Sequence, residues 1–265
     1  MFQFDEDTRV APAGDGVFTG TISDRWGIGA VPNGGYVLAV AMSALRSASN
    51  GLDPLTVTAH YLRPARPGPA RIAVEIVKAG RSYTTAAARV IQDGGEAVRV
   101  LATYGRLGDT LDTRYLAAAP PACAPRERGY ARSGDAAMGI TQRFEHRLDP
   151  STAGFQRGRP TGRAEVVGWI RFADGRPPDV HCLGLVADAF PPSVFEVLER
   201  GWVPTIELTV HVRARPTSEW LRCAFRTRVI QNGLLEEDGE IWDESGTLVA
   251  MSRQLAALPR APRSD

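Results

Sequence analysis

Apolar and polar positions along the chain fall into one order that occurs twice. In the first half, an apolar run over 36–45 follows Asn33-Gly-Gly and is followed by Asn50-Gly51. Asparagine is a favoured N-cap and glycine a favoured stop, so this run predicts a buried helix. Alternating or β-branched stretches bounded by turn residues predict strands before and after it. They cover 17–21, 55–63, 70–77, 83–92 and 96–104.

The second half repeats this succession. Its pattern predicts a helix over 179–190 and strands over 142–147, 165–172, 205–213, 220–231, 235–243 and 247–255. Short pieces recur with it: an Arg-Pro pair ends at Pro64 and again at Pro216, and an aspartate precedes the last strands at Asp93 and Asp243. An ordered set of recurrences of this kind indicates an internal duplication.

The region between the two halves has little apolar periodicity and is rich in alanine and proline, which is typical of a linker. We therefore expect an N-terminal repeat over 1–108, a linker over 109–135 and a C-terminal repeat over 136–265. One helix with several antiparallel strands predicts an α+β unit, in which a sheet wraps around a central helix.

Composition and charge limit the class of protein. The 265 residues are 43% hydrophobic and 23% charged, which suits a folded domain with a sizeable core. The 31 basic residues nearly balance the 30 acidic ones and form no run. Binding to a nucleic-acid backbone needs a basic surface, so we expect no nucleic-acid partner.

The cysteines and the first residues indicate in which compartment the protein is expected and whether it has a metal site. Cys123, Cys182 and Cys223 are far apart and have no metal-ligand spacing, so we expect neither a disulfide framework nor a zinc site. The first residues are acidic, and no apolar run is long enough to span a bilayer. These features predict a cytoplasmic protein with no membrane span, no metal and no cofactor.

The strongest candidate for chemistry is Asp188. It is the one carboxylate in the second half of the apolar run 179–190, shortly before Pro191-Pro192. Burial raises the pKa of a carboxyl group and suits it to act as a general base on water. A position on a narrow solvated stripe of the helix explains the residue equally well.

Two polar residues on the following strands can assist such a base. Thr205 begins a strand in which it alternates with apolar residues, and Gln254 lies near the end of the last predicted strand. A hydroxyl group and an amide can orient a water molecule between them. Ordinary β-propensity explains the threonine, and a surface position explains the glutamine, so both alternatives stay open.

The start of the first helix offers backbone donors. Asn33, Gly34 and Gly35 leave amide groups uncovered by side chains, as an oxyanion site requires. The same residues also form an ordinary N-cap and tight turn. The second helix begins with Pro178-Asp179 at the matching place. Proline has no N–H, so we expect only one complete site in each chain.

The chain resembles the double-hotdog acyl-CoA thioesterases of the type II group. The resemblance covers both halves and rests on five segments in order: Asn33-Gly-Gly-Tyr36, Leu62-Arg-Pro64, 188–192, 204–211 and 248–254. It implies two fused hotdog repeats, acyl-CoA as substrate and a homodimer formed through the sheets. It also implies that Asp188, Thr205 and Gln254 hold the nucleophilic water, while Asn33, Gly34 and Gly35 bind the substrate.

Two rival functions remain open. A hotdog hydratase or dehydratase for enoyl thioesters needs a histidine beside an acidic residue in the cleft, and the helix carries no such pair. A non-catalytic acyl-thioester binder is the other rival, because bulky Arg253 stands next to Gln254. Arg63, Arg81 and Arg213 are equal candidates for contacts with the phosphates of CoA.

Overall fold

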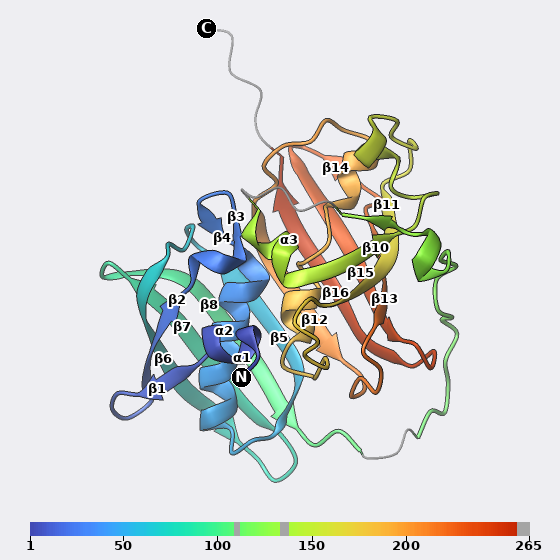
Figure 1. Cartoon of the computed structure of the whole chain (residues 1–265). Coiled ribbons are helices and arrows are strands. Elements are labelled where there is room, and N and C mark those ends of the chain that lie inside the picture. Colours follow the sequence, from blue (N-terminus) through green and yellow to red (C-terminus); the bar gives the residue numbers. More distant parts are fainter. Residues whose placement is uncertain (109–111, 133–137, 259–265) are drawn as a thin grey trace, which may run out of the picture.

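The computed structural model describes residues 1–108, 112–132 and 138–258. Fourteen strands of the described chain form one antiparallel sheet, and two short strands, β3 and β4, pair separately. The sheet runs in the order β1-β2-β6-β7-β8-β5-β12-β16-β15-β13-β11-β10-β9, with β14 beside β15. Figure 1 shows the N-terminal half in blue to green and the C-terminal half in yellow to red, side by side.

The N-terminal half wraps its sheet around one long helix, α2 (Gly34–Ala48), which contacts β2, β5, β6, β7 and β8. The other elements are α1 (Gln3–Asp7), β1 (Val10–Pro12), β2 (Val17–Ile22), the 3-10 turn η1 (Asp24–Trp26), β3 (Gly27–Ile28), β4 (Val31–Pro32), β5 (Asp53–Tyr61), β6 (Gly68–Ala79), β7 (Thr84–Gln92) and β8 (Gly95–Gly105). Each strand predicted in this half is present.

The C-terminal half has the same strands around a much shorter helix, α4 (Leu183–Val186). The other elements are η2 (Arg126–Arg128), β9 (Tyr130–Ala131), α3 (Gly139–Arg143), β10 (Phe144–Leu148), η3 (Gly154–Arg157), β11 (Glu165–Phe172), η4 (Ser193–Glu196), β12 (Thr205–Val212), β13 (Leu221–Arg226), β14 (Ile230–Gln231), β15 (Leu234–Asp243) and β16 (Leu248–Ala257). The strand predicted over 220–231 is thus divided into β13 and β14.

The strand order itself shows the duplication. Read outward from the centre, β5-β8-β7-β6-β2 in one half corresponds to β12-β16-β15-β13-β11 in the other. The halves join where β5 pairs antiparallel with β12, with His60 opposite Glu207 and Thr56 opposite His211. Two fused repeats, each a sheet wrapped around a helix, are therefore confirmed.

The sequence of α2 explains its place in the core. The side chain of Asn33 accepts a hydrogen bond from the Tyr36 N–H at 3.0 Å and so caps the helix. Apolar residues surround α2 on nearly every side, as a helix enclosed by a sheet requires. Asn50 and Gly51, both with positive φ, turn the chain away after its end.

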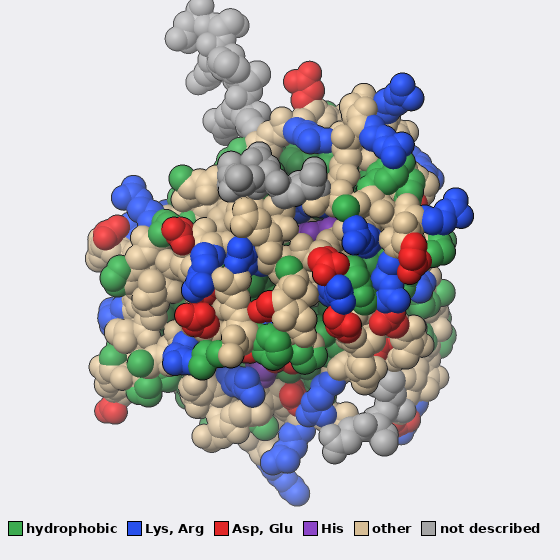
Figure 2. All heavy atoms as spheres, viewed as in Figure 1, with side chains coloured by type: hydrophobic (Ala, Val, Ile, Leu, Met, Phe, Trp, Pro, Cys, Tyr) green, Lys and Arg blue, Asp and Glu red, His purple; other side chains and the backbone are tan. Residues whose placement is uncertain are grey.

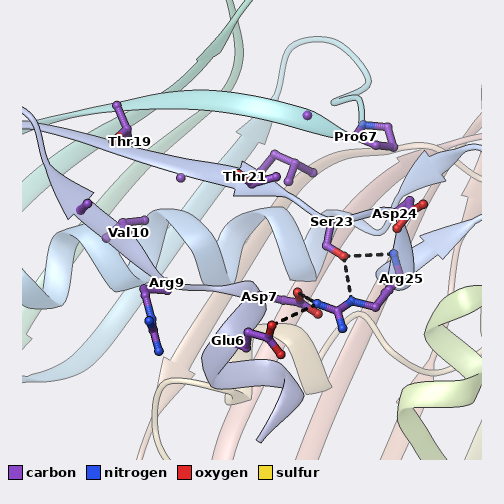
Figure 3. A pocket seen from close by; sticks show the side chains of 14 residues that line it. Glu6, Asp7, Arg9, Val10, Thr19, Thr21, Ser23, Asp24, Arg25 and Pro67 are labelled. Atoms are coloured by element: carbon purple, nitrogen blue, oxygen red, sulfur yellow. Dashed lines mark hydrogen bonds and ion pairs between the residues drawn. The ribbon is translucent and has the colours of Figure 1, made fainter. Parts of the chain in front are cut away.

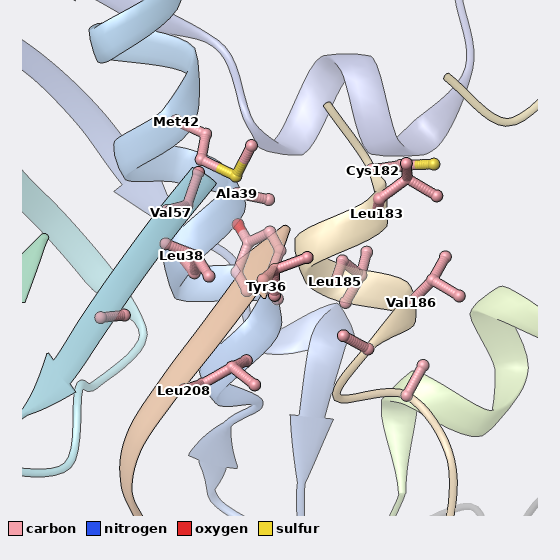
Figure 4. Packing of buried hydrophobic residues seen from close by; sticks show 14 of the residues in the cluster. Tyr36, Leu38, Ala39, Met42, Val57, Cys182, Leu183, Leu185, Val186 and Leu208 are labelled. Carbon is pink, nitrogen blue, oxygen red and sulfur yellow. The ribbon is translucent and has the colours of Figure 1, made fainter. Parts of the chain in front are cut away.

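The two helices meet at the centre of the molecule. Figure 4 shows Leu38 and Met42 on α2, with Leu183 and Leu185 on the neighbouring α4. A Cβ atom added to Gly184 would lie only 3.2 Å from the Met42 sulfur. Glycine at this position therefore lets the helices approach closely.

The prediction of a helix over 179–190 was too long. Only Leu183–Val186 is α-helical, and turns precede and follow it. The backbone carbonyl of Asp188 accepts a hydrogen bond from the Asn33 side chain at 2.9 Å, across the interface between the repeats. This tertiary contact and the proline pair at 191–192 replace continued helical bonding.

The described part of the predicted linker packs on the second repeat. The strand β9 pairs with β10, and the Trp169 indole N–H donates to the Ala124 carbonyl at 3.0 Å. The boundaries 1–108, 109–135 and 136–265 stay a prediction, and residues 109–111 and 133–137 lie outside the described residues. The segment is nevertheless more ordered at 124–131 than its composition indicates.

The surface bears charges of both signs. Figure 2 shows basic and acidic side chains interspersed over this face, with apolar side chains between them. None of the helices in the described ranges combines the length and the apolar character needed to cross a membrane.

Candidate active site

Asp188 lies against the start of α2, far from it in sequence. Its Oδ2 atom accepts hydrogen bonds from the Gly35 N–H at 2.7 Å and from the Asn33 side-chain amide at 2.9 Å. The two repeats therefore build the site jointly, because the first supplies the donors and the second supplies the carboxylate. The sequence pattern predicted that Asp188 lies within a helix. In the structure it lies in the turn after α4.

The first N–H groups of a helix have no partner inside it. At α2, the Gly35 N–H donates to Asp188, the Tyr36 N–H to the Asn33 side chain and the Val37 N–H to the Asn33 carbonyl. The Gly34 N–H has no acceptor among the described residues. Of the two amides expected to bind substrate, only that of Gly34 is open, since that of Gly35 holds the carboxylate.

Both glycines are needed for this close approach. A Cβ atom added to Gly35 would lie 2.8 Å from the Asp188 Cβ and 3.0 Å from the Leu185 Cα. One added to Gly34 would lie 3.0 Å from the ring of Tyr61 and 3.2 Å from the Asp188 carboxylate. No side chain fits between these groups without displacing them.

Burial controls the protonation of Asp188. Loss of solvation raises its pKa from 3.8 to about 6, although the hydrogen bonds from Gly35 and Asn33 lower it. A carboxyl group with this pKa is ionised at neutral pH and still basic enough to accept a proton from water.

Thr205 and Gln254 contact each other directly. The Gln254 side-chain N–H donates to the Thr205 hydroxyl oxygen at 2.7 Å. Thr205 begins β12 beside a register shift between Thr205 and Glu207, and Gln254 lies on the neighbouring β16. Arg253 forms an ion pair with Asp238 at 2.6 Å and is exposed, so it does not obstruct its neighbour Gln254.

All these residues surround one cavity of about 390 Å³ at the junction of the repeats. Asn33, Gly34, Asp188, Thr205 and Gln254 line it, and Gly35 lies just behind Asp188. Its other walls are largely apolar: Ile28, Val31, Val37, Val98, Met138, Ile140, Phe190, Phe195, Trp202 and Val203. No histidine lines it, and the described ranges contain no group of three His, Cys, Asp or Glu side chains placed to hold a metal ion.

An apolar cavity that holds a buried carboxylate, open helix amides and a Thr–Gln pair is suited to the attack of water on an acyl group. Family comparison agrees with this chemistry. The model of the acyl-CoA thioesterase N-terminal domain matches residues 22–105, and that of the C-terminal domain matches residues 118–258. The chain belongs to the acyl-CoA thioesterase family. The protein is therefore a thioesterase. The two matched domains correspond to the two repeats of the fold.

Known proteins resemble the chain over nearly its whole length. The crystal structure of a candidate thioesterase II from Thermobifida fusca has a TM-score of 0.92 and 30% identity, and covers 98% of each chain. A protein with a hot dog fold from Alicyclobacillus acidocaldarius has a TM-score of 0.88 at 24% identity, over 98% of this chain and 99% of that one. Protein Rv0499 of Mycobacterium tuberculosis is 29% identical, over 92% of this chain and 91% of its own length.

Sequence reasoning missed two polar residues of this thioesterase cavity. Glu237 of β15 is buried and accepts a hydrogen bond from the Ser193 N–H at 2.7 Å. Burial raises the pKa of Glu237, and the charge of Asp188 raises it further. The hydrogen bonds from Ser193 lower it, but their effect is smaller than that of burial. Alternation with the buried residues Leu235 and Ile241 could have revealed that Glu237 points inward.

Tyr61 is the second polar residue of the cavity that sequence reasoning missed. It lines the cavity from the end of β5, and its buried hydroxyl group has no hydrogen-bond partner among the described residues. Burial and the nearby carboxylates Asp188 and Glu207 raise its pKa, so the hydroxyl keeps its proton. The inward alternation of Val57, Ala59 and Tyr61 is the sequence signal for this position.

Of the three arginines expected near CoA phosphates, the structure brings one to the cavity. Arg63 lines it and donates hydrogen bonds to the carbonyls of Gln92 and Gly95. Arg81 and Arg213 are exposed and are not among the lining residues. Contact of any of them with CoA stays a prediction.

The matching place in the second repeat is closed by its own residues. Asp179 accepts hydrogen bonds from the N–H groups of His181 and Cys182, both at 3.0 Å, and pairs with Arg176. Ser43, which corresponds to Asp188, donates to the Ala39 carbonyl within α2. The Asp179 N–H, which corresponds to that of Gly34, donates to the Cys182 sulfur at 3.4 Å, and one site per chain stays a prediction.

A larger hollow of about 630 Å³ lies between α1, β2 and η1. In Figure 3, Arg25 extends toward Glu6 and Asp7. It contacts the Asp7 carboxylate at 2.5 Å, and that carboxylate also accepts from the Trp26 indole at 2.8 Å. Arg25 thus neutralises part of the acidic charge of this hollow, whereas the central cavity keeps its acceptor and donor open.

Proposed function

We propose that this protein hydrolyses acyl-CoA thioesters to a free acid and CoA. The observation that carries the proposal is the half-buried Asp188 carboxylate, held by Asn33 and Gly35 in the same cavity as the bonded pair Thr205–Gln254. Thr205 and Gln254 position a water molecule, and Asp188 accepts its proton as the oxygen attacks the thioester carbonyl.

The Gly34 N–H stabilises the negative charge that develops on the carbonyl oxygen. As the tetrahedral intermediate collapses, the carbon–sulfur bond breaks and the proton on Asp188 passes to the departing thiolate. The electron pair of the broken bond stays on sulfur, and the acid leaves with the oxygen of water. No covalent enzyme intermediate is required.

The test is release of free thiol from a panel of acyl-CoAs of increasing chain length, compared with the Asp188→Asn variant. Thiol release by the native protein and its loss in the variant support hydrolysis. Loss of enoyl absorbance without thiol release would instead identify a hydratase, although no histidine of the described chain lines the cavity. Saturable binding without either reaction would identify a non-catalytic binder.

We also propose that the chain forms a cytoplasmic homodimer through the outer faces of its sheets. Leu101, Met251 and Leu255 are 53%, 44% and 36% exposed on the central strands β8 and β16. They flank the seam between β5 and β12, where Thr58 contacts Thr209 at 2.8 Å. Light scattering should give twice the chain mass, and Leu101→Asp with Met251→Asp should give monomers.

A further inference from the structure

Arg132 is a cation in the cavity that the proposed reaction does not use. It follows β9 and lines the cavity together with Met138 and Phe190. One guanidinium nitrogen donates to the Ala189 carbonyl at 3.1 Å, and the other lies 3.9 Å from the sulfur of Met138. These contacts fix the Arg132 side chain beside Ala189, the residue that follows Asp188.

No carboxylate of the described chain forms an ion pair with Arg132, although it is only partly exposed. Burial, and secondarily the charge of Arg200, lower its pKa to about 10, so it remains a cation at neutral pH. A partly buried cation without a counter-ion is unfavourable in the free protein. A group that supplies the missing negative charge would relieve that cost.

A structural role does not require this charge. His146 also contacts the Ala189 carbonyl through its Nε2 atom at 3.1 Å. Burial, followed by the charge of Arg132, lowers the pKa of His146 to about 3, so the ring is neutral and its N–H can donate to that carbonyl. The carbonyl would therefore keep a donor if Arg132 were replaced.

The position of Arg132 indicates which part of the substrate reaches it. It contacts the Ala189 carbonyl and lines the same cavity as Asp188, so a ligand of its guanidinium lies in the cavity that holds the acyl group. The phosphates of CoA are separated from the thioester by the whole pantetheine arm. The acyl chain begins at the carbonyl itself.

We propose that Arg132 binds a carboxylate on the acyl group, so that this protein prefers thioesters of dicarboxylic acids. The planar guanidinium has several donors in a fork that matches a carboxylate. Asp188 and Glu237 in the same cavity would repel such a substrate, and Arg132 compensates for that repulsion. This inference rests on the proposed hydrolysis of acyl-CoA.

The experiment compares adipyl-CoA with hexanoyl-CoA, which differ only in the terminal group of the acyl chain, a carboxylate in the first and a methyl group in the second. We expect native protein to favour adipyl-CoA in kcat/KM. Arg132→Gln should reduce the ratio of the two kcat/KM values by about 10- to 100-fold, as expected for a hydrogen-bonded charge. Arg132→Lys should keep part of the preference because it keeps the charge. Arg200→Gln is the matched control and should leave the ratio unchanged.

Native protein that favours hexanoyl-CoA would overturn the inference, even if Arg132→Gln fails to fold. An equal fall in both rates in Arg132→Gln would assign Arg132 a structural role only. Hydrolysis of neither substrate would overturn the proposed function instead. In that case, calorimetry with the carboxylated and methyl-ended thioether analogues of the two substrates decides the role of Arg132, because binding needs no turnover.

Discussion

The Gly35 N–H donates to the Asp188 carboxylate at 2.7 Å, across 153 positions of sequence. This bond joins the start of the long helix of one repeat to the turn after the short helix of the other. It fixes the orientation of the proposed base, and it makes the site a property of the fused chain. Neither repeat alone contains both groups.

Replacement of Asp188 by asparagine tests the base. We expect kcat to fall by about 10²-fold or more, because the variant cannot accept the proton of water. The amide oxygen can still accept from Gly35 and Asn33, so the fold should persist. Thiol release measures the rate and circular dichroism checks folding. A well-folded variant with native turnover would exclude Asp188 from the mechanism.

The same variant should be more stable than the native protein at high pH. The pKa of Asp188 is higher in the folded protein, about 6, than its ordinary value of 3.8. Ionisation therefore favours unfolding, and stability decreases as pH rises between these values. Asp188→Asn should gain about 3 kcal/mol over native protein at pH 8. Urea unfolding at several pH values measures this difference in the free energy of unfolding, which should vanish near pH 4. A difference that does not change with pH would contradict the prediction.

Activity should follow the ionisation of Asp188. Since the base must be deprotonated and burial raises its pKa to about 6, kcat should increase with pH through this region and then level off. Burial, and not the charge of a neighbouring carboxylate, raises the pKa of Asp188, so Glu237→Gln should leave the midpoint nearly unchanged. A flat profile from pH 5 to 8 would contradict the assignment.

The Thr205–Gln254 contact predicts coupled effects. Thr205→Val and Gln254→Ala should each lower kcat more than they raise KM, because both groups position one water molecule. The double variant should lose less than the product of the two single losses. Steady-state kinetics on all four proteins measures the coupling. Independent effects confined to KM would assign both residues to binding of the acyl chain.

The glycine pair predicts one site per chain. Gly35→Ala places a Cβ atom where the structure leaves 2.8 Å to the Asp188 Cβ, so it should displace the carboxylate and abolish most activity. Ser43→Ala, at the corresponding place in the other repeat, should retain activity. Calorimetry with a non-hydrolysable acyl-CoA thioether should give one molecule bound per chain. A stoichiometry of two, or an inactive Ser43→Ala variant, would show that both places work.

The repeated order of elements and the cap at Asn33 can be predicted from the amino-acid sequence, because alternation and capping depend on neighbouring residues. The family motifs added Asp188, Thr205 and Gln254 as a set. Inward alternation in β15 also contained the signal for Glu237. Local patterns are sufficient for these features since each strand must bury one face and each helix must satisfy its first amides.

The length of the second helix and the partner of the Gly35 amide could not be predicted, because tertiary contacts set both. Both depend on the meeting of α2 with the chain around Asp188, and no local pattern encodes a contact across 153 positions. Arg132 is the extreme case: it lies in a segment whose composition predicts a linker, yet it enters the central cavity. Its role depends on which charges surround it, and packing alone determines those neighbours.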